Sequence, residues 1–201
     1  ETAGIAFGQL SGEFLRTKVG PELDAFRFAQ YAGASGISKI SAGATLADGA
    51  AVVTALRAGV NKMDEDEVDP NNRYLFITPT LYGMIRDLDT TKSKEVLETF
   101  AGIIKVPQSR FYTAIDQYDG TTSSEEAGGY VKDPTNGCDI NFMIIEKSAV
   151  IQFEKHVAPK IITPEQNQSA DAYKFGYRNV GIADVYENKV AGIYLHHKAK
   201  A

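Results

Sequence analysis

The sequence has few of the residues on which disulfides, metal sites and nucleophilic catalysis depend. Among its 201 residues are one cysteine, three histidines and no tryptophan. A single cysteine cannot form an internal disulfide and is too few for a structural zinc site. Cys138 also has no neighbouring cation in the sequence that would activate it, so we expect it to be a small filler residue. The fold must therefore be held together by packing.

Long hydrophobic runs and basic clusters are missing as well. No stretch approaches the roughly 18 apolar residues that a membrane span needs, and residues 1–10 lack the basic start and apolar run of a signal peptide. Lys and Arg total 21 against 26 Asp and Glu, giving a net charge of −5 without a basic stripe. Without a long apolar run we expect no membrane partner. Because nucleic-acid affinity comes mainly from cations placed against phosphates, we also expect no sequence-specific nucleic-acid binding.

The overall composition is typical of a globular protein. Apolar residues make up 43% and aromatic residues 10% of the chain, enough for one domain or two interleaved ones. The sequence starts without Met, inside what reads as the middle of a helix. We interpret it as a fragment of a longer protein.

The first half reads as helical. Apolar residues recur at spacings of three and four residues from Thr2 to Ala32, with an interruption at Gly20-Pro21. We expect either two helices meeting at an angle, 4–19 and 21–32, or one long kinked helix. The four glycines of 33–49 indicate a mobile connection, a candidate hinge between domains.

Asp48 is expected to cap the next helix, with Val52, Leu56, Val60 and Met63 as its buried face. This helix should end at the acidic residues 64–67 and 69, whose spacing does not match a calcium loop. Because acids at a helix C-terminus oppose the dipole, they indicate an oppositely charged partner, for which another subunit is a candidate.

Further along the chain, 73–77 reads as a strand, followed by Thr78-Pro79 as the cap and first turn of a helix. The polar stretch 116–137 predicts an exposed and partly mobile loop. Strands are expected at 140–145, where the run is apolar enough to be covered on both faces, and at 150–153, 157–162, 173–177 and 190–195. Helices first and strands later predict an α+β fold rather than a doubly wound parallel sheet.

Catalytic motifs do not emerge from the sequence. Phosphate-binding glycine motifs do not match, and His196 and His197 should point to opposite faces of a strand. Glu154 and His156 share a strand face and could form an acid–base pair, with 116–137 as a lid. An ordinary surface pair explains them equally well, and we expect all three histidines to be half-exposed strand residues. No catalytic, cofactor-binding or metal-binding residue is therefore assigned.

Three stretches carry a resemblance to a known family: GEFLRTKVGPELDAFRFAQYA at 12–32, YLFITPTLYGMIRDL at 74–88 and DAYKFGYRNVGIADVYENKVAGIYLHH at 171–197. Together they resemble the major capsid proteins of tailed phages, which have the Hong Kong 97-type fold. The first resembles the long spine helix of that family, the second the strand, turn and helix of its axial domain, and the third the returning long strand and the final strand. The N-terminal arm and extended loop of that family have no counterpart in this sequence.

The resemblance implies a Hong Kong 97-like α+β capsid fold with a spine helix, an axial domain and a peripheral domain with a long hairpin. Residues 1–45 and 147–187 would form the peripheral domain, 46–146 the axial domain, and 188–201 a final strand returning to it. The implied function is a structural subunit, not an enzyme and without cofactors, that self-associates into capsomers and encloses a viral genome. It would reside in the virion capsid after assembly in the bacterial host cytoplasm, with scaffolding and portal proteins as candidate partners.

The polar turn 163–169 lies between two predicted strands and should form an exposed hairpin tip. In this family the tip lies where capsomers meet, so Glu165, Gln166 and Asn167 are the expected contact between subunits; an idle surface turn is the alternative. Two other functions stay open. An encapsulin-like compartment shell would share the fold, and a small enzyme or ligand-binding domain would instead have a deep pocket lined by 116–137, Glu154 and His156.

Overall fold

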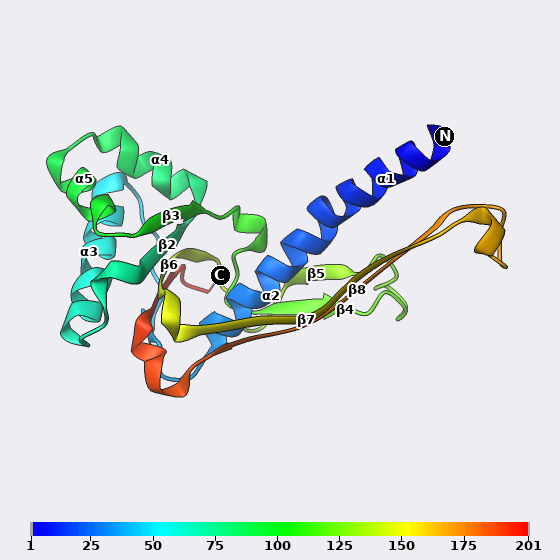
Figure 1. Cartoon of the computed structure of the whole chain (residues 1–201). Coiled ribbons are helices and arrows are strands. Elements are labelled where there is room, and N and C mark those ends of the chain that lie inside the picture. The colour runs from blue at the N-terminus through cyan, green and yellow to red at the C-terminus, as the bar shows by residue number, and fades with distance from the viewer. Residues whose placement is uncertain (1, 201) are drawn as a thin grey trace.

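The computed structural model describes residues 2–200. A sheet with helices forms one end of the molecule, and the N-terminal helix and a long two-stranded ribbon extend away from it (Figure 1). The helices are α1 (Thr2–Phe14), α2 (Gly20–Gly33), α3 (Gly49–Glu65), α4 (Pro79–Leu88) and α5 (Thr91–Glu98). The strands are β1 (Ser38–Lys39), β2 (Arg73–Ile77), β3 (Gly102–Lys105), β4 (Ile115–Tyr118), β5 (Gly129–Lys132), β6 (Ile140–Glu146), β7 (Val150–Ile162), β8 (Lys174–Val185) and β9 (Ile193–His197).

The N-terminal helix is continuous, so the alternative of two helices meeting at an angle is wrong. A π-helical segment, Leu15–Val19, joins α1 to α2, and the flanking residues Phe14 and Gly20 keep right-handed helical angles. The Gly20 N–H donates to the Leu15 carbonyl, five residues back. Pro21 lacks an N–H, and its ring crowds the carbonyl four residues earlier. The wider π turn accommodates the proline without ending the helix.

The glycine-rich segment after α2 is attached to the sheet, and the prediction of a mobile connection is wrong. Its strand β1 pairs in parallel with β9, and the Ala44 N–H donates to the His197 carbonyl at 2.9 Å. At Gly43, where φ is +70°, a Cβ would lie 2.6 Å from the Ala199 nitrogen. Glycine here lets the backbone pass close to the C-terminal strand.

The main sheet has five strands in the order β1-β9-β6-β2-β3. The outer pairs, β1 with β9 and β2 with β3, are parallel, whereas β6 is antiparallel to both of its neighbours. Every residue of β6 is buried. The prediction of a strand covered on both faces is therefore confirmed, and the sheet is mixed, as an α+β fold allows.

Two apolar cores lie on opposite faces of this sheet. Met143 and Ile145 of β6 face a core shared with the C-terminal part of α2, where Phe28 is buried. Phe142 and Ile144 face the core formed with α3, α4 and α5. The end of the first helix thus belongs to the core, and its beginning projects from the sheet (Figure 1).

The helix α3 begins as predicted, because the Asp48 carboxylate accepts a hydrogen bond from the Ala51 N–H at 2.8 Å. Leu56 and Met63 of its expected face are fully buried, and Val60 is half-buried. The next helix, α4, has Pro79 in its first turn as predicted. The side chain of Thr78 makes no capping hydrogen bond there, so that part of the prediction is wrong.

The acidic end of α3 has partners inside the same chain. Arg73 is 2% exposed, and its guanidinium donates to Asp64 Oδ1 at 2.6 Å and to two backbone carbonyls. Lys62 pairs with Asp66, also at 2.6 Å. For Asp64 and Asp66 the expectation of a partner on another subunit is wrong, because Arg73, nine residues after Asp64, folds back to pair with Asp64 and Lys62 pairs with Asp66.

The predicted loop 116–137 contains a hairpin. Strands β4 and β5 pair antiparallel, from Ile115 opposite Lys132 to Tyr118 opposite Gly129. Residues 119–128 form its exposed turn. The loop prediction failed because turn-forming residues outnumber apolar ones even beside the strands, and pairing and packing against α2 outweigh their local preference.

The ribbon of β7 and β8 is longer than the sequence predicted. The expected strands 150–153 and 157–162 are one strand with a bulge between Glu154 and His156, and β8 runs on to Val185. The expected final strand at 190–195 begins later, because 187–192 forms a 3₁₀ turn. The α+β class is confirmed; the division into 1–45, 46–146, 147–187 and 188–201 stays a prediction.

Candidate functional site

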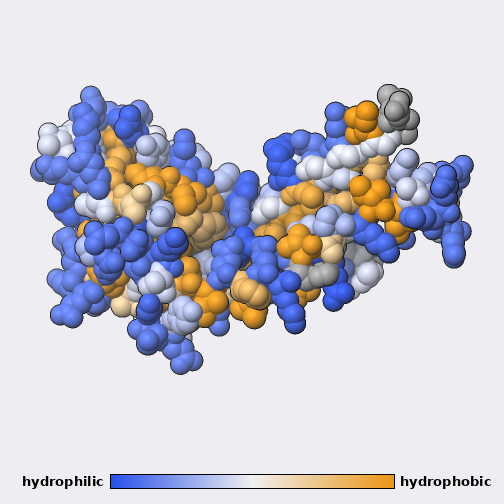
Figure 2. Space-filling view, viewed as in Figure 1, coloured by the Kyte–Doolittle hydropathy of each residue, from blue (hydrophilic) through white to orange (hydrophobic). Residues whose placement is uncertain are grey.

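Exposed apolar side chains are concentrated on the arm, by which we mean α1, the start of α2 and the ribbon. Eight of them are 41–65% exposed: Ile5, Leu10, Phe14, Phe153, Val157, Ile161, Val180 and Ile182. Figure 2 shows apolar residues gathered over this part of the molecule. Exposed apolar side chains gathered on one part of a molecule are typical of sites where proteins interact.

Aromatic contacts hold the ribbon against the helix. Phe7 stacks on Tyr173 with ring centroids 5.2 Å apart, and Phe14 meets Phe175 edge-on at 6.1 Å. Phe175 and Tyr177 are half-buried and alternate with exposed residues. Beside these rings an apolar groove of about 540 Å³ stays open, with Leu10 in its wall. Within the arm the helix and the ribbon therefore pack against each other, whereas the apolar side chains beside this contact stay uncovered.

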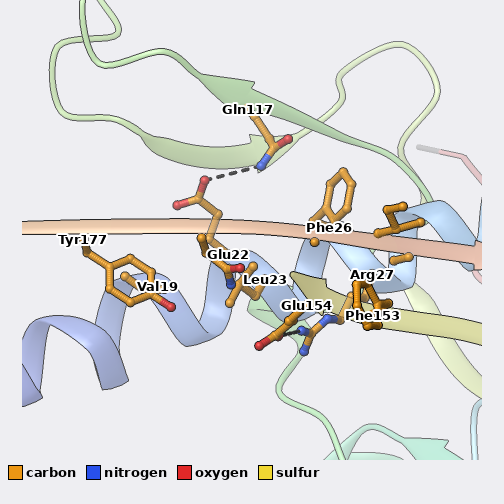
Figure 3. Close-up of a pocket in the computed structure, with 13 residues that line it drawn as sticks. Val19, Glu22, Leu23, Phe26, Arg27, Gln117, Phe153, Glu154 and Tyr177 are labelled. Atoms are coloured by element: carbon orange, nitrogen blue, oxygen red, sulfur yellow. Dashed lines mark hydrogen bonds and ion pairs between the residues drawn. The ribbon is translucent and has the colours of Figure 1, made fainter. Parts of the chain in front are cut away.

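A second groove, of about 350 Å³, lies between α2, the ribbon and β4 (Figure 3). Arg27 forms an ion pair with Glu154 at its wall, and Gln117 donates to Glu22 at 3.3 Å. Because Glu154 is held by a guanidinium, it is not free to act as a general acid or base in this arrangement. The side chain of His156 lies outside the described side chains, so the pair of Glu154 and His156 stays a prediction.

The other residues considered for chemistry have structural surroundings. His196 is 1% exposed and stacks on Phe142 with centroids 4.9 Å apart, so the expectation of a half-exposed residue is wrong for it. His197 is half-buried, as predicted. Cys138 is half-buried, and its N–H donates to Thr113 Oγ1 at 2.8 Å. Within residues 2–200 no group of three or more His, Cys, Asp or Glu is placed to hold a metal ion.

The hairpin tip forms where it was predicted. Pro164–Gln166 make a 3₁₀ turn between β7 and β8, with Glu165 and Gln166 exposed. Asn167 is half-buried, and its Oδ1 accepts from Ser169 while its Nδ2 donates to the Ala172 carbonyl at 2.7 Å. Asn167 therefore shapes the turn, whereas Glu165 and Gln166 are presented to the surroundings.

Comparisons with known proteins place the fold. Neither a family model nor a curated protein matches the sequence. A chain of a virus-like particle from Pyrococcus furiosus superposes with a TM-score of 0.58 at 11% identity, over 88% of this chain and 62% of that chain. A chain of the capsid of cyanophage P-SCSP1u gives 0.53 at 16% identity, over 90% and 61%. One from Mycobacterium phage Che8 gives 0.55 at 10% identity, over 89% and 58%.

The chain has a capsid-protein fold. It spans about three fifths of the length of each of these neighbours. The resemblance found in the sequence and the structural match agree, although identities of 10–16% are low. Among the described residues, no helix is both long and apolar enough to cross a membrane.

The arm projects from the sheet and keeps apolar side chains exposed (Figure 1). This surface was not predicted from the sequence, nor was a cluster of cations on the ribbon, Lys160, Lys174 and Arg178. The spacing of Lys174 and Arg178 along one strand face was visible in the sequence. That Lys160 lies beside them depends on the register of β7 against β8.

Proposed function

We propose that the chain is a structural subunit of a phage capsid that self-associates into capsomers and encloses a viral genome. The match of about nine tenths of the chain to capsid and virus-like-particle structures supports this proposal most strongly. The uncovered apolar arm is consistent with it, because a subunit of a shell buries such surfaces only after assembly.

Under this proposal the fold is Hong Kong 97-like. The continuous helix would be the spine helix, 1–45 with the ribbon 147–187 the peripheral domain, and 46–146 with 188–201 the axial domain. The pairing of β1 with β9 supports the return of the C-terminal strand to the sheet. It also ties the segment after the spine helix to that strand, so the two proposed domains share a sheet edge.

The partners would be further copies of the chain, with scaffolding and portal proteins as additional candidates. The subunit would reside in the virion capsid, assembled in the host cytoplasm, and its role would be structural rather than enzymatic. An encapsulin-like compartment shell shares the fold and is not better supported. For the hairpin tip we propose that Glu165 and Gln166 contact a neighbouring subunit while Asn167 holds the turn that presents them.

The test is the assembly state of the purified chain. Mass photometry across a concentration series, with negative-stain microscopy of the concentrated sample, should give small oligomers or rings of five or six subunits. Closed shells are not expected, because association costs several kcal/mol before any net binding appears. A chain that stays monomeric at every concentration and ionic strength would contradict the proposed function.

A further inference from the structure

The ribbon has a basic face. Phe175 and Tyr177 face the helix, so the alternate residues of β8 face away from it. Lys174 and Arg178 lie on this outer face, and Lys160 joins them because it pairs with Gly176, which lies between them. All three cationic side chains are exposed. We call these three residues the basic face.

The basic face has no acidic partner within residues 2–200, since none of its side chains takes part in an ion pair there. Like charges gathered on one ribbon face repel one another. Beyond the bulge, towards the sheet, the ribbon carries an apolar pair: Phe153 and Ile182 are directly opposite each other, about 60% exposed, and line the groove beside α2. A partner must therefore offer acids next to an apolar surface.

The β4–β5 hairpin offers that combination. Residues 116–131 contain four acids and no Lys or Arg, and we call Asp116, Asp119, Glu125 and Glu126 the acidic hairpin. Val131, directly opposite Asp116, is 38% exposed.

The turn of this hairpin is held in shape by its own hydrogen bonds. Asp119 accepts from the N–H groups of Thr122 and Thr121, both at 2.7 Å. The hydrogen bonds of Thr122 and then of Thr121 hold the pKa of Asp119 well below its usual value, so it stays charged. The acidic hairpin is thus a preformed, charged surface with an apolar residue beside it.

We propose that the basic face of the ribbon binds the acidic hairpin of a second copy of this chain. Charge complementarity supports it, as does the exposed apolar residue beside each charged surface. A nucleic acid would match the cations but not Phe153 and Ile182, because a phosphate backbone has no apolar counterpart for them. Two different surfaces that meet head to tail generate rings when the rotation closes. This inference rests on the proposed self-association and specifies where it occurs.

A charge-exchange experiment tests it. The first variant carries Lys160→Glu, Lys174→Glu and Arg178→Glu; the second carries Asp116→Lys and Glu126→Lys, with Asp119 kept because it shapes the turn. In the first variant both surfaces are acidic. In the second the hairpin has no net charge, because the two new Lys are balanced by Asp119 and Glu125, so each variant should self-associate at least about tenfold more weakly than the wild type. In the mixture the unchanged basic face of the second variant meets the unchanged acidic hairpin of the first, and association should return. Both variants keep a net negative charge, so overall attraction cannot explain pairing.

The matched control is Arg57→Glu, Arg86→Glu and Lys92→Glu, exposed cations on α3, α4 and α5 with the same charge change as the first variant. It should associate as the wild type does, and its mixture with the second variant should not form pairs beyond the wild-type level. Sedimentation velocity at 50 and 500 mM NaCl measures all of these, with circular dichroism to verify folding. Salt should weaken the association, because exposed charges are screened.

Two results would overturn the inference: a mixture of the first and second variants that associates no better than either variant alone, or a first variant that associates like the wild type. If that first variant instead loses binding to a 30-nucleotide oligonucleotide, the basic face is a nucleic-acid-binding surface. A failure of the proposed function can be distinguished from a failure of this inference. Rings that form regardless of these substitutions would keep the capsid role and remove this contact, whereas paired variants without any ring would keep the contact and remove the capsid role.

Discussion

His196 is a buried histidine that its neighbours hold in the neutral form. The Ala44 carbonyl can only accept, so the Asn141 amide nitrogen must face it, at 2.8 Å. The same nitrogen lies 3.0 Å from His196 Nδ1, which must then be the acceptor. A proton on Nδ1 would place two donors against each other. Burial, and then the charge of His197, lowers the pKa of His196 to about 4.

This constraint predicts acid sensitivity above the usual carboxylate range. The pKa of His196 in the folded chain lies below its ordinary value of 6.5, so the unfolded chain binds the proton first. The contribution to stability is full above about pH 6.5 and declines as the pH falls towards 4, by up to about 3 kcal/mol. Urea unfolding at pH 7 and pH 5 should show this loss in the wild type and a much smaller loss in His196→Gln. Equal losses in both would contradict the assignment.

Two glycines in neighbouring helices give a second prediction at the residue scale. At Gly49 a Cβ would lie 2.2 Å from the Met84 carbonyl oxygen, whereas at Gly83, inside α4, nothing lies within 4 Å. Gly49→Ala should destabilise the fold by about 2 kcal/mol or more, because backbone cannot yield. Gly83→Ala should stabilise it by about 0.5–1 kcal/mol through helix propensity. Thermal unfolding of both variants measures this, and a neutral Gly49→Ala would show that α3 and α4 do not pack so closely.

At the scale of the element, the residues of the ribbon tip have two roles that can be tested separately: Asn167 holds the turn, and Glu165 and Gln166 are the proposed contact. Glu165→Ala with Gln166→Ala should change the free energy of unfolding by less than about 0.5 kcal/mol, because both side chains are exposed. Asn167→Ala removes the hydrogen bonds to Ser169 and Ala172, so amide exchange in 163–172 should accelerate in that variant alone. Equal exchange in both variants would mean that Asn167 does not hold the turn. If the tip contacts a neighbour, the double variant should also reduce self-association.

The elements differ in how far the sequence predicted them. The buried strand β6, the start of α3 and, apart from the Thr78 cap, the strand-turn-helix at 73–88 were predicted correctly, because each depends on local periodicity or, for α3, on a local cap. The short strands β4 and β5 were missed, and the glycine-rich segment was misread as mobile. In both cases the deciding partner lies far away in sequence: α2 for the first, β9 for the second. Local preference cannot reveal such partners.

At the scale of the whole molecule, the projecting arm predicts an elongated particle in solution. A compact chain of this length would have a radius of gyration of about 16 Å, and the monomer should measure clearly larger by small-angle X-ray scattering (Figure 1). Dilution to the monomer, verified by mass photometry, is the control. A value near 16 Å would mean that the arm folds back onto the sheet, which would also conceal the exposed apolar surface.

The sequence by itself determined the α+β class, the positions of the long helix and the central strand, and the exposed tip at 163–169. These follow from periodicity and turn residues, which act within a few positions along the chain. Only the tertiary structure decided that His196 is buried, that Asp64 pairs with Arg73, and that Lys160 lies beside Lys174 and Arg178. Each of these depends on strand register or on a fold-back between distant segments. The charge pattern that we propose for assembly exists only once β7 and β8 are paired, because register brings its two halves together.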